Sequence, residues 1–315
     1  MKKMKILWRV LLAIALSSCT NSNTNEKYDS TTFFLTDNYK VVKVDEGLKM
    51  AYLDLNPTGE KIILLLHGEP NYSLVYRNIA PNLCKKGYRV IVPDLIGFGN
   101  SSKPQNFNLI TYSNHTKWLT EFISKLGLKN IHLFAHDWGA MISLRIIAEK
   151  PQLFDKVAIS YGFLFDGTEK LPESFLGFRQ YAKSDSSFSA GNIMDWGTYS
   201  KIPDSIKKKY DEPFKNPSDN YAVRKFPWLI PDNPNDKEGL INKRLTRKLR
   251  TYEKPFITIW GNHEDSLWEG KDSLLQNLIP GANKQEHFIL ESNHFIQEDQ
   301  PQRLTNILLN FFNKK

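Results

Sequence analysis

Cysteine is scarce in this sequence of 315 residues, which contains only Cys19 and Cys84. If Cys19 is used for modification, as argued below, one cysteine remains, and a single cysteine cannot form an internal disulfide. The folded part must therefore depend on its hydrophobic core, which a chain of this length can readily form. Length alone allows one large domain or two.

Clustered basic residues and metal-ligand spacings are also missing. The net charge of +8 comes mostly from scattered lysine and arginine residues rather than from one basic patch, which argues against a nucleic-acid-binding protein. Most histidines are dispersed without metal-ligand spacing: His67, His115, His132, His136 and His263. The sequence therefore predicts neither a metal nor an organic cofactor.

The N-terminus has the pattern of an export signal. Residues 1–5 contain three lysines and precede an apolar run at residues 6–16. This run is too short to span a bilayer permanently. Leu16-Ser17-Ser18-Cys19 follows and resembles a bacterial lipobox, which implies acylation of Cys19, palmitate included. We therefore expect a signal peptide over residues 1–18 and an exported lipoprotein of the bacterial cell envelope. The alternative is an ordinary signal peptide that contains a cysteine.

The residues after the lipobox separate into three kinds of segment. Residues 19–32 are rich in Asn, Ser and Thr and predict a flexible tether. Residues 33–162 and 240–315 alternate short apolar runs with helix-length stretches, which predicts an α/β fold with a mostly parallel sheet covered on both faces. Residues 163–239 lack buried-strand runs and are rich in aromatics and prolines, which predicts a helical cap inserted between two core strands.

The boundaries of the expected elements follow from these apolar runs. Strands are expected at residues 39–44, 49–55, 62–66, 88–92, 131–135, 157–161, 256–260 and 287–290. Helices are expected at residues 78–86, 112–126, 138–149 and 296–312 in the core, and at 172–182 and 203–210 in the cap. A cap in this position lies over the carboxyl edge of the sheet, where ligands bind in open α/β folds.

The strand at 131–135 runs into His136-Asp137-Trp138-Gly139-Ala140 and then directly into a helix. This is the pattern of a nucleophile elbow, which presents one side chain above the sheet, and here that side chain is Asp137. A carboxylate can displace a leaving group from saturated carbon to form an ester, which water then hydrolyses. The alternative role for Asp137 is a cap on the helix that begins at Trp138.

Two further positions match the chain order of nucleophile, acid and base in this fold. His294 follows the last expected strand and is the candidate base. Gly261-Asn262-His263-Glu264-Asp265 follows the preceding strand, and we predict Glu264 as the acid that orients His294, with Asp265 as the alternative.

His67-Gly68-Glu69-Pro70 follows the strand at 62–66. The backbone N–H of Glu69, together with that of Trp138, is expected to form an oxyanion hole for ester hydrolysis. Asp94 to Ser101, after the next strand, is interpreted as a structural loop.

These residues resemble the haloalkane dehalogenase family of the α/β-hydrolase fold, in the branch that carries His-Gly-Glu-Pro. The resemblance covers about residues 41–312 and includes segments 70–77, 210–214, 223–227 and 293–299. It implies a small apolar halogenated substrate and water, no cofactor, and a departing halide held by two N–H donors. Trp138 matches the first donor, and an indole N–H in an apolar pocket can bind a large anion.

The sequence departs from the family at the second donor. Where the cap of similar sequences has tryptophan, Phe175-Leu176-Gly177-Phe178-Arg179 has Phe178, which donates no hydrogen bond. Three cap residues are alternatives, although each is also suited to the cap core: Tyr181, Trp196 and Trp228.

Two other functions remain open. An epoxide hydrolase would use the same nucleophile with cap tyrosines as acids, and the candidates are Tyr181, Tyr199, Tyr210 and Tyr221. A surface lipoprotein that binds a small molecule without turnover would need neither Asp137 nor His294. Turnover of dibromoethane or of styrene oxide discriminates among the three.

Overall fold

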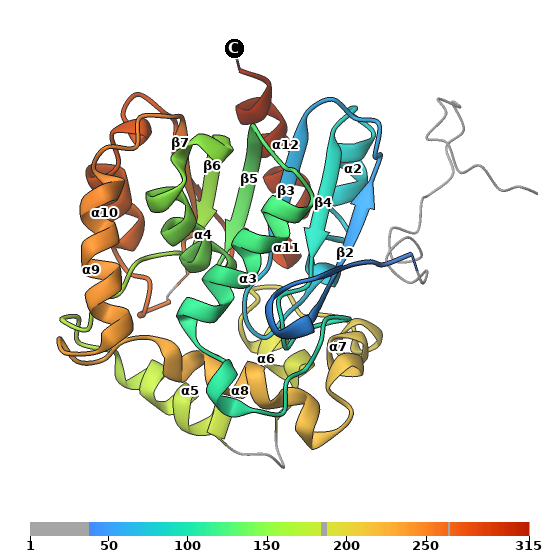
Figure 1. The fold of residues 1–315 in the computed structure, drawn as a ribbon, viewed down its shortest axis with the longest axis vertical. Coiled ribbons are helices and arrows are strands. Elements are labelled where there is room, and N and C mark those ends of the chain that lie inside the picture. The colour runs from blue at the N-terminus through green and yellow to red at the C-terminus, as the bar shows by residue number, and fades with distance from the viewer. Residues whose placement is uncertain (1–37, 184–187, 264, 315) are drawn as a thin grey trace, which may run out of the picture.

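The computed structural model describes residues 38–183, 188–263 and 265–314. The predicted signal peptide, Cys19, the tether and Glu264 lie outside these residues. Figure 1 shows an α/β architecture in which a central sheet is surrounded by helices. The predicted fold class is confirmed.

The sheet has eight strands in the order β1-β2-β4-β3-β5-β6-β7-β8. Strands β1 and β2 pair antiparallel, as do β2 and β4, and the pairs from β4 through β8 are parallel. The strands are β1 Lys40–Lys43, β2 Lys49–Leu55, β3 Ile62–Leu66, β4 Arg89–Pro93, β5 Ile131–His136, β6 Phe154–Ser160, β7 Phe256–Gly261 and β8 Phe288–Leu290.

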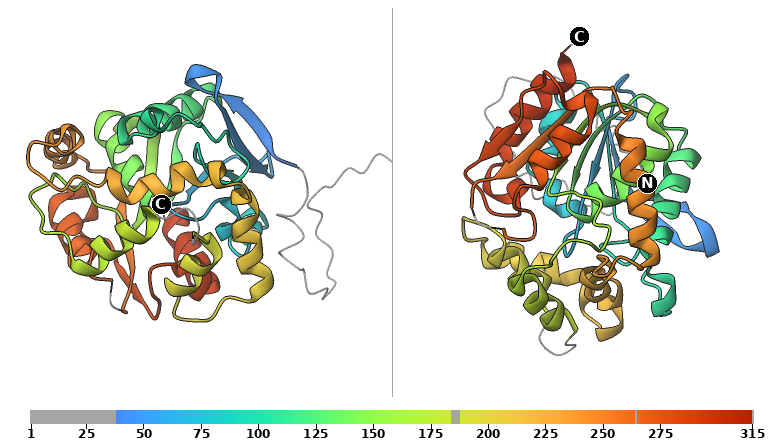
Figure 2. Two further views of the ribbon diagram at one scale, coloured as in Figure 1. Left: turned by 90° about the horizontal axis from the view of Figure 1, so that it is seen from below. Right: turned by 90° about the vertical axis from the view of Figure 1, so that its left-hand side faces the viewer.

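Helices cover both faces of the sheet because its central strands are apolar on both sides; all six residues of β5, for example, are buried. One face carries α3 Tyr112–Lys125, α4 Trp138–Glu149, α9 Lys237–Leu249 and α10 Lys271–Leu278, and the other carries α2 Ala80–Cys84 and α12 Pro301–Asn313 (Figures 1 and 2). The core thus forms two apolar layers around the sheet.

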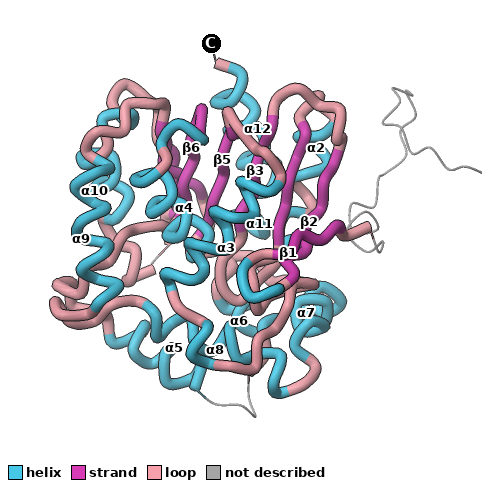
Figure 3. Tube along the Cα trace, in the orientation of Figure 1, coloured by secondary structure: helices cyan, strands magenta, loops and turns pink. Residues whose placement is uncertain are grey.

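Short helices and turns between β6 and β7 lie below the sheet in Figure 3, at the end opposite the C-terminus. They include α5 Glu173–Lys183, α6 Ala190–Trp196, α7 Asp204–Asp211 and α8 Tyr221–Lys225. These helices cover the carboxyl ends of the parallel strands. We refer to these four helices and their connections as the cap.

Most expected elements match the structure within two residues at each end, and two differ more. The strand expected at 157–161 begins earlier, at Phe154. The helix expected at 296–312 is interrupted, so that α11 Ile296–Asp299 and α12 are separate. Gln300 adopts φ −133° and ψ 47° because Pro301 excludes the helical conformation from the residue before it.

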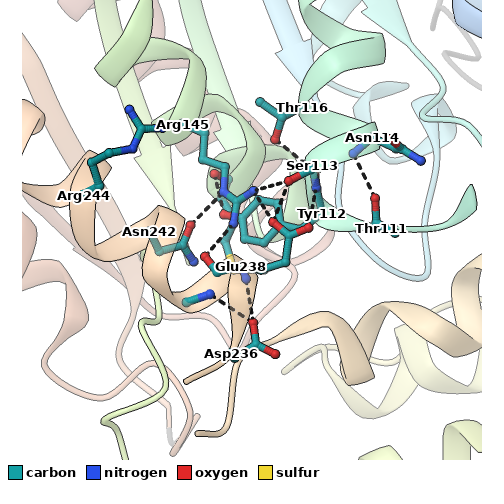
Figure 4. A network of polar contacts seen from close by, with 12 residues as sticks. Thr111, Tyr112, Ser113, Asn114, Thr116, Arg145, Asp236, Glu238, Asn242 and Arg244 are labelled. Carbon is teal, nitrogen blue, oxygen red and sulfur yellow. Dashed lines mark hydrogen bonds and ion pairs between the residues drawn. The ribbon is translucent and has the colours of Figure 1, made fainter. Parts of the chain in front are cut away.

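A buried polar network joins α9, which follows the cap, to α3 and α4 (Figure 4). Arg145, 1% exposed, donates to Glu238 Oε2 at 2.7 Å and to Asn242 Oδ1 at 2.7 Å. The same Glu238 carboxylate accepts from Ser113 Oγ at 2.8 Å. The guanidinium lies 3.3 Å from the ring centre of Tyr112. Every charge of this network therefore has a partner, as burial requires.

A second buried network joins the cap to the core. Arg77 forms a two-pronged ion pair with Glu298, with distances of 2.5 and 2.7 Å. Tyr210 of α7 also donates to Glu298. This carboxylate therefore fixes a cap helix to α11, just beyond the segment that carries His294.

Within the described ranges, no helix is both long and apolar enough to cross a membrane. Nor do three or more histidine, cysteine or acidic side chains gather as a potential metal site in residues 38–183, 188–263 and 265–314.

Candidate active site

Asp137 lies at a sharp turn between β5 and α4, with φ 52° and ψ −124°. A non-glycine residue with positive φ is strained, and the turn persists because the strand and the helix fix its two ends. The chain packs closely here: a Cβ on Gly68 would lie 2.2 Å from Asp137 Oδ1, and one on Gly139 would lie 2.4 Å from the carbonyl oxygen of His67. Glycine is therefore required at both positions.

The Asp137 carboxylate is held by backbone amides. Oδ1 accepts from the N–H of Glu69 at 2.8 Å, and the N–H of Trp138 also bonds the carboxylate. Asp137 precedes the helix but forms no side-chain capping bond to it. The geometry thus disfavours the alternative role of helix cap, and it brings together the two N–H groups expected to form an oxyanion hole.

His294 lies beside this carboxylate, with 3.7 Å between His294 Nε2 and Asp137 Oδ2. On its other side, Nδ1 lies 2.8 Å from Asp265 Oδ2. The acid at His294 in the described structure is therefore Asp265, the alternative weighed from the sequence. Glu264, the first choice, lies outside the described residues.

In this triad, burial and the neighbouring charges shift the pKa values of His294 and Asp137 in opposite directions. Burial lowers the pKa of His294, but the hydrogen bond and charge of Asp265 and the charge of Asp137 outweigh it, so the pKa stands above its ordinary value. Burial raises the pKa of Asp137, while His294 and the two backbone N–H groups act in the opposite direction. The carboxylate is thus poorly solvated, which favours nucleophilic attack.

Two positioning residues were missed by sequence reasoning. The hydroxyl of Tyr161 donates to the carbonyl of Asn293 at 3.0 Å and accepts from the N–H of Gly261 at 2.9 Å, so it joins the loops of the acid and the base. His136 Nε2 lies 2.8 Å from the carbonyl oxygen of His294. Tyr161 follows β6 and has a φ of 49°. Only its position after a strand could have drawn attention to it.

The triad opens into a cavity of about 640 Å³ between the cap and the sheet. Asp137, Asp265 and His294 line it, together with Glu69 and Trp138. The remainder of the lining is mostly apolar, with contributions from Phe175, Phe178, Ile193, Trp196, Pro227, Ile230, Leu267, Trp268 and Phe295. Such a cavity fits a small apolar molecule.

Phe178 also lines this cavity, so its ring stands in the wall where the resemblance implied a second donor. The three alternatives differ in their surroundings. The indole N–H of Trp228 already donates to the carbonyl of Arg179 at 3.1 Å, and Trp228 does not line the cavity. Trp196 lines the cavity but is 61% exposed, and Tyr181 packs against its ring without lining the cavity.

Comparisons with known proteins identify the family of this chain. A family profile described as alpha/beta hydrolase fold matches residues 61–301. The chain is 37% identical to a haloalkane dehalogenase of Psychrobacter cryohalolentis, over 85% of this chain and 88% of that protein. It is 36% identical to a haloalkane dehalogenase of Mycobacterium marinum, over 84% of this chain and 89% of that protein.

A solved structure shows the same likeness in three dimensions. The haloalkane dehalogenase DpaA from Paraglaciecola agarilytica, described as tetrameric, superposes with a TM-score of 0.79 and 27% identity. The match covers 88% of this chain and 92% of that one. The elbow, the facing histidine and the covered cavity are thus found in a chain that belongs to the haloalkane dehalogenase family of α/β-hydrolase-fold enzymes.

Proposed function

We propose that this protein hydrolyses carbon–halogen bonds through an ester on Asp137. The observation that carries the proposal is the carboxylate itself, which is strained at the elbow, held through Oδ1 and faced by His294 within an apolar cavity. Its role as nucleophile, and those of Trp138, Glu69, Asp265 and His294, belong to this proposal.

In the first step, Asp137 Oδ2 attacks the carbon that bears the halogen. The new C–O bond forms as the C–X bond breaks, and its electron pair leaves with the halide. Oδ1 is the oxygen held by the N–H of Glu69, which leaves Oδ2 for the attack. The indole of Trp138 stabilises the halide.

In the second step, water attacks the ester carbonyl carbon of Asp137 and His294 Nε2 accepts its proton. The negative charge that develops on Oδ1 is stabilised by the N–H groups of Glu69 and Trp138. Collapse expels the alkoxide, which takes the proton from His294. The carboxyl group then loses its proton to solvent, so the products are an alcohol, a halide and a proton.

Epoxide hydrolysis is the weaker alternative because the cavity lacks tyrosine hydroxyls among its described lining residues. Tyr210 is fully buried and donates to Glu298, and Tyr199 stacks on His263 with 55% of its surface exposed. Parallel assays with dibromoethane and styrene oxide test this choice. We expect bromide release from the first and no diol from the second; the opposite result favours the epoxide hydrolase, and failure of both favours a binding protein.

The covalent step is tested by replacing His294 with phenylalanine. Without its base, the enzyme should form the ester but hydrolyse it too slowly for turnover. Treatment with a bromoalkane should therefore add the mass of one alkyl group to the peptide that contains Asp137. The double variant with Asp137→Asn is the control and should remain unmodified. An unmodified elbow peptide in His294→Phe, beside an active unsubstituted enzyme, contradicts the mechanism.

We further propose that Cys19 is acylated and holds the protein on a bacterial membrane. The support is the sequence of residues 1–19, which has the pattern of an export signal and ends in a segment that resembles a lipobox. Growth of an expressing bacterium with labelled palmitate should label the protein, and Cys19→Ala should remove the label and release the protein from membranes. Retention of both label and membrane association in Cys19→Ala would exclude this anchor.

A further inference from the structure

The cavity contains an acidic side chain without a protein partner. Glu69 is 7% exposed, lines the cavity, and its Oε1 is buried with no hydrogen-bond partner among the described residues. Its neighbour Asp137 is also an acid, and the two residues are joined only through the backbone N–H of Glu69. A buried carboxylate with no donor and an adjacent negative charge is strongly unfavourable, whereas a neutral carboxylic acid is not.

The cavity lacks the second donor at the cap position where the resemblance implied one, although Trp196 and Trp268 also line it. Trp138 supplies one indole, while Phe178 presents an apolar ring. Trp228 uses its N–H on a backbone carbonyl. A neutral carboxylic acid has one O–H donor, which can take the place of the donor that Phe178 does not provide.

We propose that Glu69 is a neutral carboxylic acid whose O–H donates a hydrogen bond to the departing halide, alongside the indole of Trp138. The cap can therefore carry Phe178 where similar sequences have tryptophan, because Glu69 provides the second donor from the core. This inference rests on the proposed dehalogenase function and identifies a further catalytic group for it.

The electrostatic surroundings of Glu69 support the neutral form. Burial and the charge of Asp137 both raise the pKa of the Glu69 carboxyl well above its ordinary range. Among the described residues, the charge of Glu69 also affects the pKa of the Tyr181 hydroxyl, a group that carries no positive charge. His294 lies next to Asp137 and is paired with Asp265. Buried acids kept neutral in order to donate a hydrogen bond are known from other active sites.

The proton stays on Glu69 throughout the reaction. Halide ions are far weaker bases than a carboxylate, so the O–H group donates a hydrogen bond and transfers nothing. Glu69 thus acts twice in the cycle with different groups: its side chain stabilises the halide during ester formation, and its backbone N–H stabilises the oxyanion during ester hydrolysis.

Bromide binding to the full-length protein, followed by quenching of Trp138 fluorescence with Trp138→Phe as the blank, tests the proposal without turnover. Glu69→Leu and Glu69→Met keep the backbone N–H but remove the O–H, and each should weaken bromide binding about ten- to a hundredfold. Glu69→Gln keeps an N–H donor at the same length and should stay within about threefold of the unsubstituted protein. Adding Phe178→Trp to Glu69→Leu should restore most of the affinity.

Bromide binding that is unchanged in both donor-free variants, or equally lost in Glu69→Gln, overturns the proposal. If the donor-free variants do not fold, bromide affinity measured at rising pH decides. Ionisation of Glu69 should weaken bromide binding in the unsubstituted protein, whereas the affinity of Glu69→Gln should not change. The same pH dependence of affinity in both proteins refutes the O–H donor. An unsubstituted protein that neither binds nor releases bromide would instead refute the proposed function.

Discussion

The sheet edge and the cap contribute differently to the active site. At the sheet edge, strands and backbone hydrogen bonds determine where each group lies: Asp137 follows β5, Glu69 follows β3, and His294 follows β8. The cap instead consists of short helices held by side chains, as in the Arg77–Glu298–Tyr210 network. The core therefore determines the positions of the reacting groups, whereas the cap shapes the cavity. A cap residue such as the second halide donor can change without moving the nucleophile.

The first prediction concerns the core and has the largest effect. Asp137→Ala should reduce bromide release from a bromoalkane by at least about a thousandfold, because the nucleophile is lost while the fold remains. Trp228→Phe, a cap variant outside the cavity lining, is the matched control and should retain turnover. Residual activity above a few per cent in Asp137→Ala, with circular dichroism unchanged, would contradict the role of this carboxylate.

The acid of the triad provides the second prediction. Asp265→Asn should slow ester hydrolysis about a hundredfold or more, because the amide no longer orients and stabilises the imidazole as a charged acid does. Glu264→Gln is the matched neighbour and should lose much less activity. A larger loss in Glu264→Gln than in Asp265→Asn would restore Glu264 as the acid.

Cap attachment is the subject of the third prediction. Glu298→Gln leaves Arg77 buried beside a weaker partner and should lower the free energy of unfolding by about 3 kcal/mol, as measured in urea. Its control is Glu149→Gln, which breaks the exposed pair with Arg244 and should change stability by less than about 0.5 kcal/mol. Equal effects of the two variants would show that the buried network does not stabilise the protein.

The fourth and smallest effect is a shift in pH dependence. His294 must be neutral to accept a proton from water, so ester hydrolysis should fall as pH drops through its raised pKa. Removing the charge of Asp265 lowers that pKa, so the acidic limb of Asp265→Asn should move to lower pH. The rate of ester hydrolysis after a single alkylation, measured across pH, gives the acidic limb of the unsubstituted protein and that of Asp265→Asn. Movement of the limb to higher pH in Asp265→Asn would contradict the pairing of His294 with Asp265.

Much of the core could be predicted because its signals are local. Buried strands appear as short apolar runs, and the strand–turn–helix around Asp137 is readable within about ten residues. Prediction from local patterns stopped where long-range contacts decide. The choice between Glu264 and Asp265 depends on a loop fixed partly by Tyr161, a residue about one hundred positions earlier whose hydroxyl bonds the N–H of Gly261.

The cap was predictable as helical but not in its role at the site. Phe178 reveals the loss of one donor, yet the sequence does not show that Trp228 is engaged by Arg179. Nor does it show that the side chain of Glu69, considered only for its backbone N–H, lies in the cavity without a partner. These features depend on packing between distant segments.

A single turnover in water enriched in heavy oxygen tests the central claim most directly. With enzyme in excess over bromoalkane, water attacks the carbonyl carbon of the ester, so the label should enter the carboxylate of Asp137 while the alcohol carries ordinary oxygen from the enzyme. Mass spectrometry of the elbow peptide and of the alcohol measures both. Label found in the alcohol and absent from Asp137 would mean that water attacks the substrate directly, and the covalent account would be wrong.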